Sequence, residues 1–235
     1  MDDARDRIDV RYATLGDCHE AIGLVVVVDV IRAFTTAAHV FDRGAAEIWP
    51  VAGVDEAFAL RRAHPEMLVI GEEDGVMVEG FDAGNAPSQL DGVDFAGRTV
   101  VQRTSAGTQG IARSTGAEHL LAASFVCADA TVRAIRSLAY GRVTFVVTGV
   151  DDQRDGDEDR ACADYLAALM QDRRPDPAPY LARVPASTAG RGFVDPDCTH
   201  KPIADLHLVM ELDRFDIALE VDRGGGRDVL RARRV

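Results

Sequence analysis

An aspartate and an arginine follow the most apolar run of the chain. Residues 24–28 read Leu-Val-Val-Val-Val, which predicts a strand buried on both faces, and Asp29 and Arg32 come where the pattern turns helical. A carboxylate at the end of a buried strand needs a partner such as a metal ion, an arginine or a reacting group. Two simpler interpretations compete with a functional one: Asp29 caps the following helix, or it forms an ion pair with Arg32.

Polar or glycine-rich segments follow three further predicted strands. They read Gly71-Glu72-Glu73-Asp74-Gly75, then Arg103-Thr104-Ser105-Ala106-Gly107-Thr108-Gln109, and Gly149-Val150-Asp151-Asp152. Ligands of open α/β sheets bind at the carboxyl ends of the strands, so we expect the four segments to converge on one crevice.

These segments offer different chemistry. Residues 104–110 present hydroxyls and backbone N–H groups at a predicted helix start, which makes an anion cradle, although an ordinary capped turn has the same pattern. The crowded carboxylates of residues 72–74 need a divalent cation or an arginine, unless they form a solvated acidic loop. Glu158 and Asp159 begin a predicted helix, where the helix dipole alone favours acidic residues.

The elements that position these residues alternate between strand and helix patterns. Strands are predicted over residues 24–30, 47–51, 67–70, 99–103, 119–123 and 143–148, and helices over 33–42, 55–64, a short stretch after 108, 128–140 and 158–170. This alternation predicts an α/β fold with a largely parallel sheet flanked by helices.

The character of the chain changes after about residue 171. Prolines 175, 177, 179 and 185 mark an irregular connection, and residues 207–233 read as short strands around Gly224-Gly225-Gly226. We therefore expect one α/β domain over residues 1–235. Its last part, about 172–235, is expected to be an irregular, β-rich extension that covers the fold or lies at an edge of the sheet.

Composition limits the classes of partner. A formal net charge of −13 over 235 residues argues against nucleic acid and anionic membranes. Four cysteines without paired spacing indicate neither a zinc site nor a disulfide framework. Residues 1–9 are charged and no apolar run is long enough to span a bilayer, so we expect a cytoplasmic protein that acts on a small molecule. Composition leaves open whether the protein forms a homo-oligomer.

Motifs of several known enzyme classes can be compared with the sequence. Cys127 and Arg133 have the Cys-x5-Arg spacing of cysteine-dependent phosphatases, but the segment lacks glycines and has a helical pattern, so we interpret the match as coincidence. Residues 29–31 do not form the Asp-x-Asp of aspartyl-phosphate enzymes. Lys201 is the single lysine, so a P-loop lysine is absent and a Schiff-base lysine has one candidate.

Five blocks of the sequence, taken in order, resemble the 2-phosphosulfolactate phosphatase family, named for a step of coenzyme M biosynthesis. The blocks are residues 28–36 (VDVIRAFTT), 80–87 (GFDAGNAP), 103–108 (RTSAGT), 123–125 (ASF) and 158–163 (EDRACA). The resemblance covers roughly residues 23–170 and implies a magnesium-dependent phosphomonoesterase with an α/β architecture.

The resemblance also implies roles for individual residues. It implies that the site contains Asp29, Arg32, Glu72, Asn85, Thr104, Thr108, Glu158 and Asp159. Two positions depart from the family pattern: Glu73 stands where an arginine is usual, and Ser105-Ala106 where the pattern reads Thr-Asn. The departures leave the substrate open.

The working hypothesis is hydrolysis of a phosphate monoester of a small anionic hydroxy acid, 2-phosphosulfolactate or a related compound. The expected catalytic residues are Asp29, Arg32, Glu158 and Asp159, with Mg²⁺ held by Asp29, Glu72 and Asp159. Substrate would be bound by Asn85, Arg103, Thr104, Ser105, Gly107 and Thr108. The alternatives are a non-catalytic anion-binding or regulatory protein, and a hydrolase with a Ser105 nucleophile, which lacks a Gly-x-Ser-x-Gly elbow.

Overall fold

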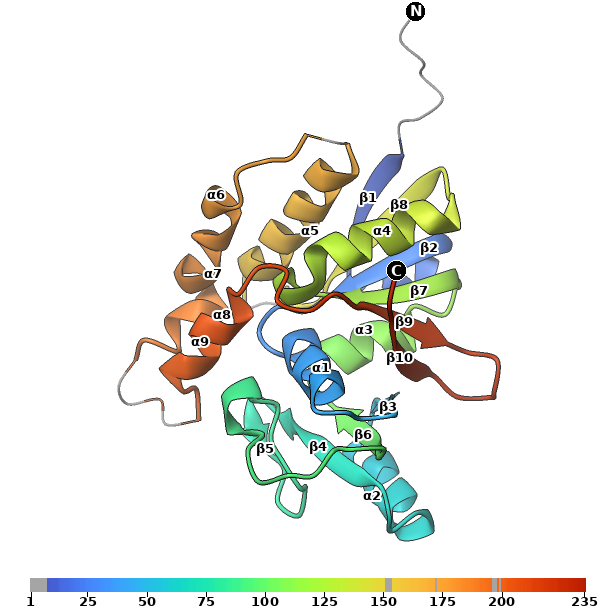
Figure 1. Cartoon of the computed structure of the whole chain (residues 1–235), viewed down its shortest axis with the longest axis vertical. Helices are drawn as coiled ribbons and strands as arrows, with labels where there is room; N and C mark the ends of the chain where they lie inside the picture. The colour runs from blue at the N-terminus through green and yellow to red at the C-terminus, as the bar shows by residue number, and fades with distance from the viewer. Residues whose placement is uncertain (1–7, 151–153, 172, 196–197, 199) are drawn as a thin grey trace, which may run out of the picture.

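A mixed sheet runs through the described chain (Figure 1). The structure, a computed structural model, describes residues 8–150, 154–171, 173–195, 198 and 200–235. Across the sheet lie β1 (Asp9–Thr14), β8 (Arg142–Val147), β2 (Gly23–Val28), β7 (Ala117–Ala123), β9 (Ala218–Asp222), β10 (Val229–Arg233), β3 (Glu47–Val51), β6 (Thr99–Arg103), β4 (Leu68–Glu73) and β5 (Val76–Met77). The predicted α/β fold with a largely parallel sheet is confirmed.

Helices flank this sheet. They are α1 (Ala33–Asp42), α2 (Val54–Ala63), α3 (Gly107–Arg113), α4 (Ala128–Leu138), α5 (Asp157–Met170), α6 (Ala178–Leu181), α7 (Arg183–Ala186), α8 (Thr188–Arg191) and α9 (Ile203–Val209). None of the helices formed by the described residues is long and apolar enough to cross a membrane.

Strand β2 is buried on both faces, as its valine run predicts. Leu24, Val26 and Val28 pack into a cluster with residues of α4 and α5. Val25 and Val27 point the other way, into a cluster with residues of α1 and α3. Because side chains alternate along a strand, this run supplies both layers of the core and fixes the strand end that carries Asp29.

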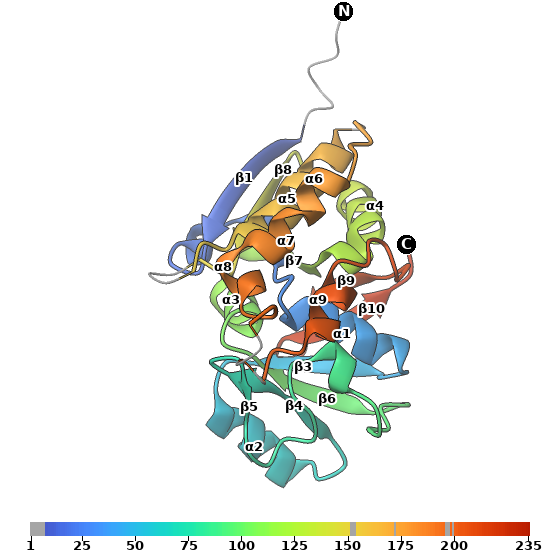
Figure 2. The same cartoon turned by 90° about the vertical axis from the view of Figure 1, so that its left-hand side faces the viewer.

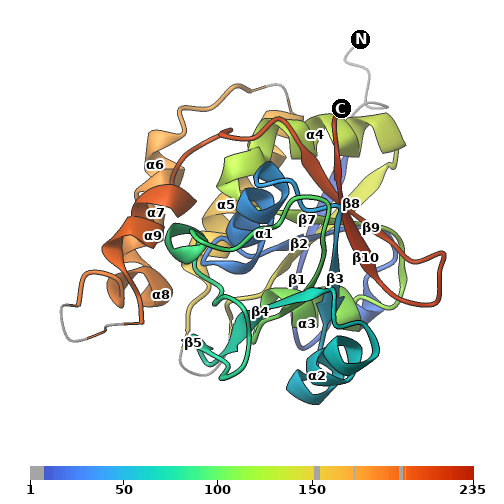
Figure 3. The same cartoon turned by 60° about the horizontal axis from the view of Figure 1, so that its bottom comes forward.

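The C-terminal strands lie in the middle of the sheet, which corrects the expectation of an edge or cover. Strand β9 pairs with β7, and β10 joins β9 to β3 through the pair Leu230 and Ile48 (Figure 3). Leu219 and Leu230 have no exposed surface, so the hairpin is held by burial between its neighbours. Charged residues alternate with these leucines along the two strands, a pattern that is also typical of an edge strand.

The connection after α5 is helical and not irregular. Helices α6 and α7 pack on α5, and α8 follows them (Figure 2). His207, expected in a strand, lies in α9. These helices are short, and the prolines among them hide the helical period.

Two groups of parallel strands run in opposite directions on either side of this hairpin. Strands β1, β8, β2 and β7 are mutually parallel, as are β3, β6 and β4. The hairpin is antiparallel to both neighbouring strands, so the two groups run in opposite directions. Neighbouring strands of a sheet are rotated relative to one another by roughly 20–25°, so the twist accumulates across the strands between β2 and β6. Residues that follow strands of both groups line one cleft.

Candidate active site

A cleft of about 730 Å³ lies where these strand ends meet. It is lined by Asp29, Ile31, Arg32, Glu72, Asp74, Gly75, Asn85, Ser105, Ala106, Arg154, Thr188, Ala189, Phe193 and Lys201. The expected convergence of the segments after β2, β4 and β6 is therefore confirmed. Asp151 and Asp152, in the segment after β8, lie outside the described residues, and Arg154 represents that segment in the lining.

Asp29 both contacts the start of α1 and lines the cleft. Its Oδ1 accepts a hydrogen bond from the N–H of Ala33 at 2.9 Å, so one oxygen satisfies the first N–H of α1, although the N-cap residue itself is Arg32. Its Oδ2 lies 3.4 Å from the Thr148 hydroxyl, a long contact. Burial, reinforced by the charge of Glu72, raises the pKa of Asp29 to about 6.

Two more carboxylates lie behind Asp29, on the first turn of α5. Asp159 is fully hydrogen-bonded: Oδ1 accepts from Val30 N at 2.7 Å, and Oδ2 accepts from Gly149 N at 2.8 Å and Thr148 Oγ1 at 3.2 Å. Burial and the charges of Glu158 and Asp29 raise the pKa of Asp159 well above its usual value. Asp159 thus joins the ends of β2 and β8 to α5.

Glu158 is the carboxylate with a free oxygen. It is 2% exposed, and its Oε2 is buried without a hydrogen-bond partner among the described residues. Burial, with the charge of Asp29 adding to it, raises the pKa of Glu158. A Cβ on Gly149 would lie 2.9 Å from Glu158 Oε1, so only glycine leaves room for the carboxylate there. A buried carboxylate oxygen without a donor can be satisfied by a cation, a proton or a water.

Glu72 organises the opposite side of the cleft. Its Oε1 accepts from Ser105 N at 2.6 Å, and its Oε2 accepts from Gly75 N at 2.6 Å and Ser105 Oγ at 3.1 Å. These bonds tie the β4–β5 turn to the segment after β6. Both oxygens of Glu72 are occupied, as are those of Asp159.

Arg32 is neutralised by a residue outside the sequence-predicted set. Its Nη1 donates to Asp205 Oδ2 at 2.6 Å, and this pair is buried. Its Nη2 reaches Gly75 O at 3.4 Å, and its guanidinium lies 5.2 Å from the Phe193 ring centroid. The alternative of an Asp29–Arg32 ion pair is wrong, because Arg32 pairs with α9 instead.

The predicted anion cradle is closed by bonds within itself. Thr104 N donates to Thr108 Oγ1 at 2.9 Å, and Thr108 N donates to Thr104 Oγ1 at 3.0 Å. Neither threonine lines the cleft, nor does Gly107, on which a Cβ would lie 2.8 Å from Asp29 Oδ2. Their roles as substrate ligands stay predictions; the observed bonds fix the start of α3 against Asp29.

Arg103 also lies outside the cleft lining. Its Nη2 pairs with Glu73 at 3.0 Å, and its Nη1 donates to Glu72 O at 2.6 Å. Glu73 thus neutralises the arginine expected to hold a second anionic group. Asn85, by contrast, lines the cleft, and its side-chain oxygen is buried without a partner.

Comparison with known proteins identifies the family of the chain. The family model for 2-phosphosulpholactate phosphatase matches residues 12–183. The chain belongs to the 2-phosphosulfolactate phosphatase family. It is 33% identical over 171 residues to a probable 2-phosphosulfolactate phosphatase of Bacillus subtilis (72% of this chain, 74% of the relative). It is 35% identical over 164 residues to one of Deinococcus radiodurans (68% of each) and 36% over 148 residues to one of Thermus thermophilus (63% and 61%).

Membership places the chain in a family of phosphoric monoester hydrolases and confirms the resemblance read from the five blocks. Several cleft residues lie beyond the matched region and were missed. The cleft residues of this region are Thr188, Ala189, Phe193 and Lys201. Asp205 does not line the cleft itself but is paired with Arg32, which does. The single lysine is the one signal for this region, and no local pattern places it near Asp29.

The cysteine interpretation is also resolved within the described chain. Cys127 is fully buried and does not line the cleft, and burial raises the pKa of its thiol. A protonated, buried thiol is inert as a nucleophile. The Cys-x5-Arg match in this phosphatase is a coincidence of spacing.

Two carboxylates of the site have oxygens that would suit a magnesium ion whose other ligands come from elsewhere. No three histidine, cysteine or carboxylate side chains of the described residues are grouped so as to hold a metal on their own. Mg²⁺ commonly uses one or two carboxylates together with substrate phosphate oxygens and water. Among the described residues, Glu158 Oε2 has no hydrogen-bond partner and Asp29 Oδ2 has only a long contact. These two carboxylate oxygens could therefore serve as metal ligands.

Proposed function

We propose that the protein is a magnesium-dependent phosphatase that hydrolyses the phosphate monoester of a small anionic hydroxy acid, 2-phosphosulfolactate or a close relative. The observation that carries this proposal is the unpartnered, buried oxygen of Glu158 behind Asp29 at a cleft lined by Arg32. Acidic and basic groups on one cleft suit a substrate that brings both a phosphate and a bound cation.

Asp29 and Glu158 would hold the ion in this proposal. When bound, Mg²⁺ neutralises charge on the phosphoryl group. Asp159 and Glu72, whose oxygens accept N–H and O–H donors, would position the surrounding loops. This assignment revises the expected ligand set of Asp29, Glu72 and Asp159, and either set remains a proposal.

The substrate would be oriented by the residues that line the cleft. Arg32, kept in place by Asp205, would donate its remaining N–H groups to phosphoryl oxygens. Asn85 has an unpartnered side-chain oxygen that can accept from a substrate hydroxyl or a water. Asp29, the only one of the three neighbouring carboxylates that lines the cleft, would orient a water or attack phosphorus.

The test is phosphate release from purified protein, with Glu158→Gln as the variant. Glutamine keeps the size of the side chain and removes the charge, so we expect release to fall by at least about 100-fold, the scale of losing one preorganised electrostatic group. Glu56→Gln, in the exposed first turn of α2, makes the same chemical change away from the cleft and should keep parent activity. Parent-like release by Glu158→Gln would disprove the assignment.

One observation favours a second candidate, a non-catalytic anion-binding protein. Arg32 and Arg103 are both paired with carboxylates of this chain, which weakens their attraction for a substrate. This candidate predicts binding of phosphorylated acids without phosphate release.

We also propose a cytoplasmic location, a single domain and a role in coenzyme M biosynthesis. The four free cysteines support the first, and the pairing of N-terminal and C-terminal strands in one sheet supports the second. The third rests on the membership in the 2-phosphosulfolactate phosphatase family alone. A homo-oligomer stays a prediction.

A further inference from the structure

Lys201 is a cleft residue that no sequence motif accounts for. It is the single lysine of the chain and lies beyond residue 183, where the family match ends. It lines the same cleft as Asp29 and Arg32. Its Nζ lies 6.0 Å from the ring centroid of Phe193, which is 4% exposed. Arg32 lies against the same ring, so one ligand can reach both cations.

Lys201 differs from the arginines of this region in its partners. Arg32 is paired with Asp205, and Arg103 with Glu73. Lys201 forms no ion pair with any carboxylate among the described residues, and Asn85, in the same lining, has an unpartnered buried oxygen. Among the described cations that line the cleft, Arg32 is paired with Asp205 and Arg154 interacts electrostatically with Asp29, whereas Lys201 has no carboxylate partner and can offer its full charge to an incoming acid group.

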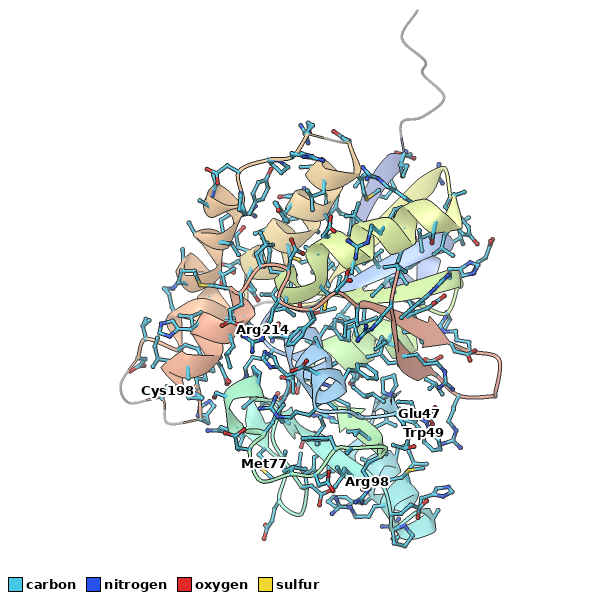
Figure 4. All side chains as sticks on the ribbon, viewed as in Figure 1. Glu47, Trp49, Met77, Arg98, Cys198 and Arg214 are labelled. Carbon is cyan, nitrogen blue, oxygen red and sulfur yellow. The ribbon has the colours of Figure 1, made fainter. Side chains whose placement is uncertain are left out.

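The backbone around Lys201 leaves space for its ammonium group. A Cβ on Gly192 would lie 2.8 Å from Lys201 Nζ, so a side chain there would displace it. Across the cleft, a Cβ on Gly75 would lie 4.0 Å from Lys201 Cε. The ammonium thus lies between the end of α8 and the β4–β5 turn. Two labels in Figure 4 help to locate this position: Cys198 precedes Lys201 in the chain, and Met77 lies on β5, which follows the β4–β5 turn.

We propose that Lys201 binds the second acidic group of the substrate, a carboxylate or a sulfonate, and so sets the specificity of this enzyme. The proposal rests on the proposed phosphatase function and deepens it. An ammonium beside an apolar ring and without an internal counter-ion attracts an anion and gains nothing from a neutral group. Arg103, held by Glu73, does not compete for this role.

The experiment compares three phosphate esters that differ stepwise. 2-Phosphosulfolactate carries a sulfonate and a carboxylate, 2-phospholactate only the carboxylate, and isopropyl phosphate neither. We would measure kcat/KM for each with the parent, Lys201→Met and Lys201→Arg. Arg62→Met removes one exposed positive charge on α2 and serves as the matched control.

We expect Lys201→Met to lower at least one of the two stepwise ratios of kcat/KM by about 10- to 100-fold, the scale of one charge-assisted hydrogen bond. The ratio that falls identifies the acid: sulfonate for the first step, carboxylate for the second. Lys201→Arg should retain most of the ratio, and Arg62→Met all of it. Equal losses on all three esters, or ratios within twofold of the parent, would overturn the proposal.

If the parent releases phosphate from none of the esters, the proposed function fails and the role of Lys201 is tested by binding. Titration calorimetry with 3-sulfolactate, which has both acidic groups and no phosphate, should then show at least tenfold weaker binding to Lys201→Met. Equal dissociation constants, or no binding by the parent, would overturn the proposal on its own.

Discussion

Replacing Asp29 with asparagine should stabilise the metal-free protein while abolishing its activity. Asp29 is 3% exposed and lies with Glu158 and Asp159, whose charges oppose its own. Asparagine keeps the Oδ1 that accepts from Ala33 N and removes the charge. It also offers an N–H to the neighbouring oxygens, of which Thr148 Oγ1 lies 3.4 Å from Asp29 Oδ2.

The size of the effect follows from the raised pKa of Asp29. A carboxyl whose pKa moves from 3.8 to about 6 on folding destabilises the fold, when ionised, by about 3 kcal/mol. Asparagine still leaves an amide to be buried, so we expect a gain of about 1 to 3 kcal/mol at pH 7.5, or roughly 2 to 10 °C in Tm. Since the pKa is raised in the folded state, the gain is small near pH 4, grows as pH rises from the unfolded-state value of 3.8 toward the folded-state value of about 6, and is complete above that.

Thermal unfolding in EDTA at pH 7.5 and pH 4.5 measures this gain, and phosphate release measures the loss of activity. Asp17→Asn is the matched control: hydrogen bonds from Thr14 lower the pKa of Asp17, so its charge is favourable and its removal should not stabilise. An Asp29→Asn protein less stable than the parent at pH 7.5 would show that this charge is compensated in the fold. The account of the carboxylate cluster would then be wrong.

Two other predictions concern stability away from the reacting groups. His39, 3% exposed and 4.9 Å from Phe215 between ring centroids, has its pKa lowered to about 4 by burial, with Arg214 (Figure 4) and Arg43 adding to it. The neutral ring therefore stabilises the fold above pH 6.5, and about 2 to 3 kcal/mol should be lost as pH falls from 6.5 to 4. Denaturant titrations across this range should show that slope, and an unchanged slope in His39→Gln would exclude His39 as its source. Asp205→Asn leaves Arg32 buried without its counter-charge and should cost about 3 to 5 kcal/mol in the free energy of unfolding. A loss below about 1 kcal/mol by urea titration would mean that Arg32 finds another partner.

Local sequence patterns were sufficient for the elements that carry the site. Helix α1 and strands β3 and β6 have the predicted bounds, because their apolar periods are clear and each ends at a turn or polar segment. Strand β1 was missed because its residues are half-exposed and mixed in character. The central position of the β9–β10 hairpin was beyond reach, since it depends on which buried strands its leucines meet.

The roles within the site were harder to predict than its members. Asp29, Arg32, Glu72, Asn85 and Ser105 do line the cleft. Which carboxylate keeps a free oxygen depends on the backbone amides nearby: Asp159 meets Val30 and Gly149, whereas Oε2 of Glu158, one residue earlier, meets no donor. The Asp205 partner of Arg32 lies 173 residues along the chain, at a distance that no local pattern encodes.

The most direct test of the central claim is phosphate release from 2-phosphosulfolactate by the parent protein, measured with Mg²⁺ and again after EDTA. The account predicts turnover that requires Mg²⁺ and returns when the ion is restored after chelation. Release at the same rate in EDTA would contradict the assignment of Asp29 and Glu158 as holders of a cation. Absence of release in both, from folded protein that binds the ester, would contradict phosphatase activity itself.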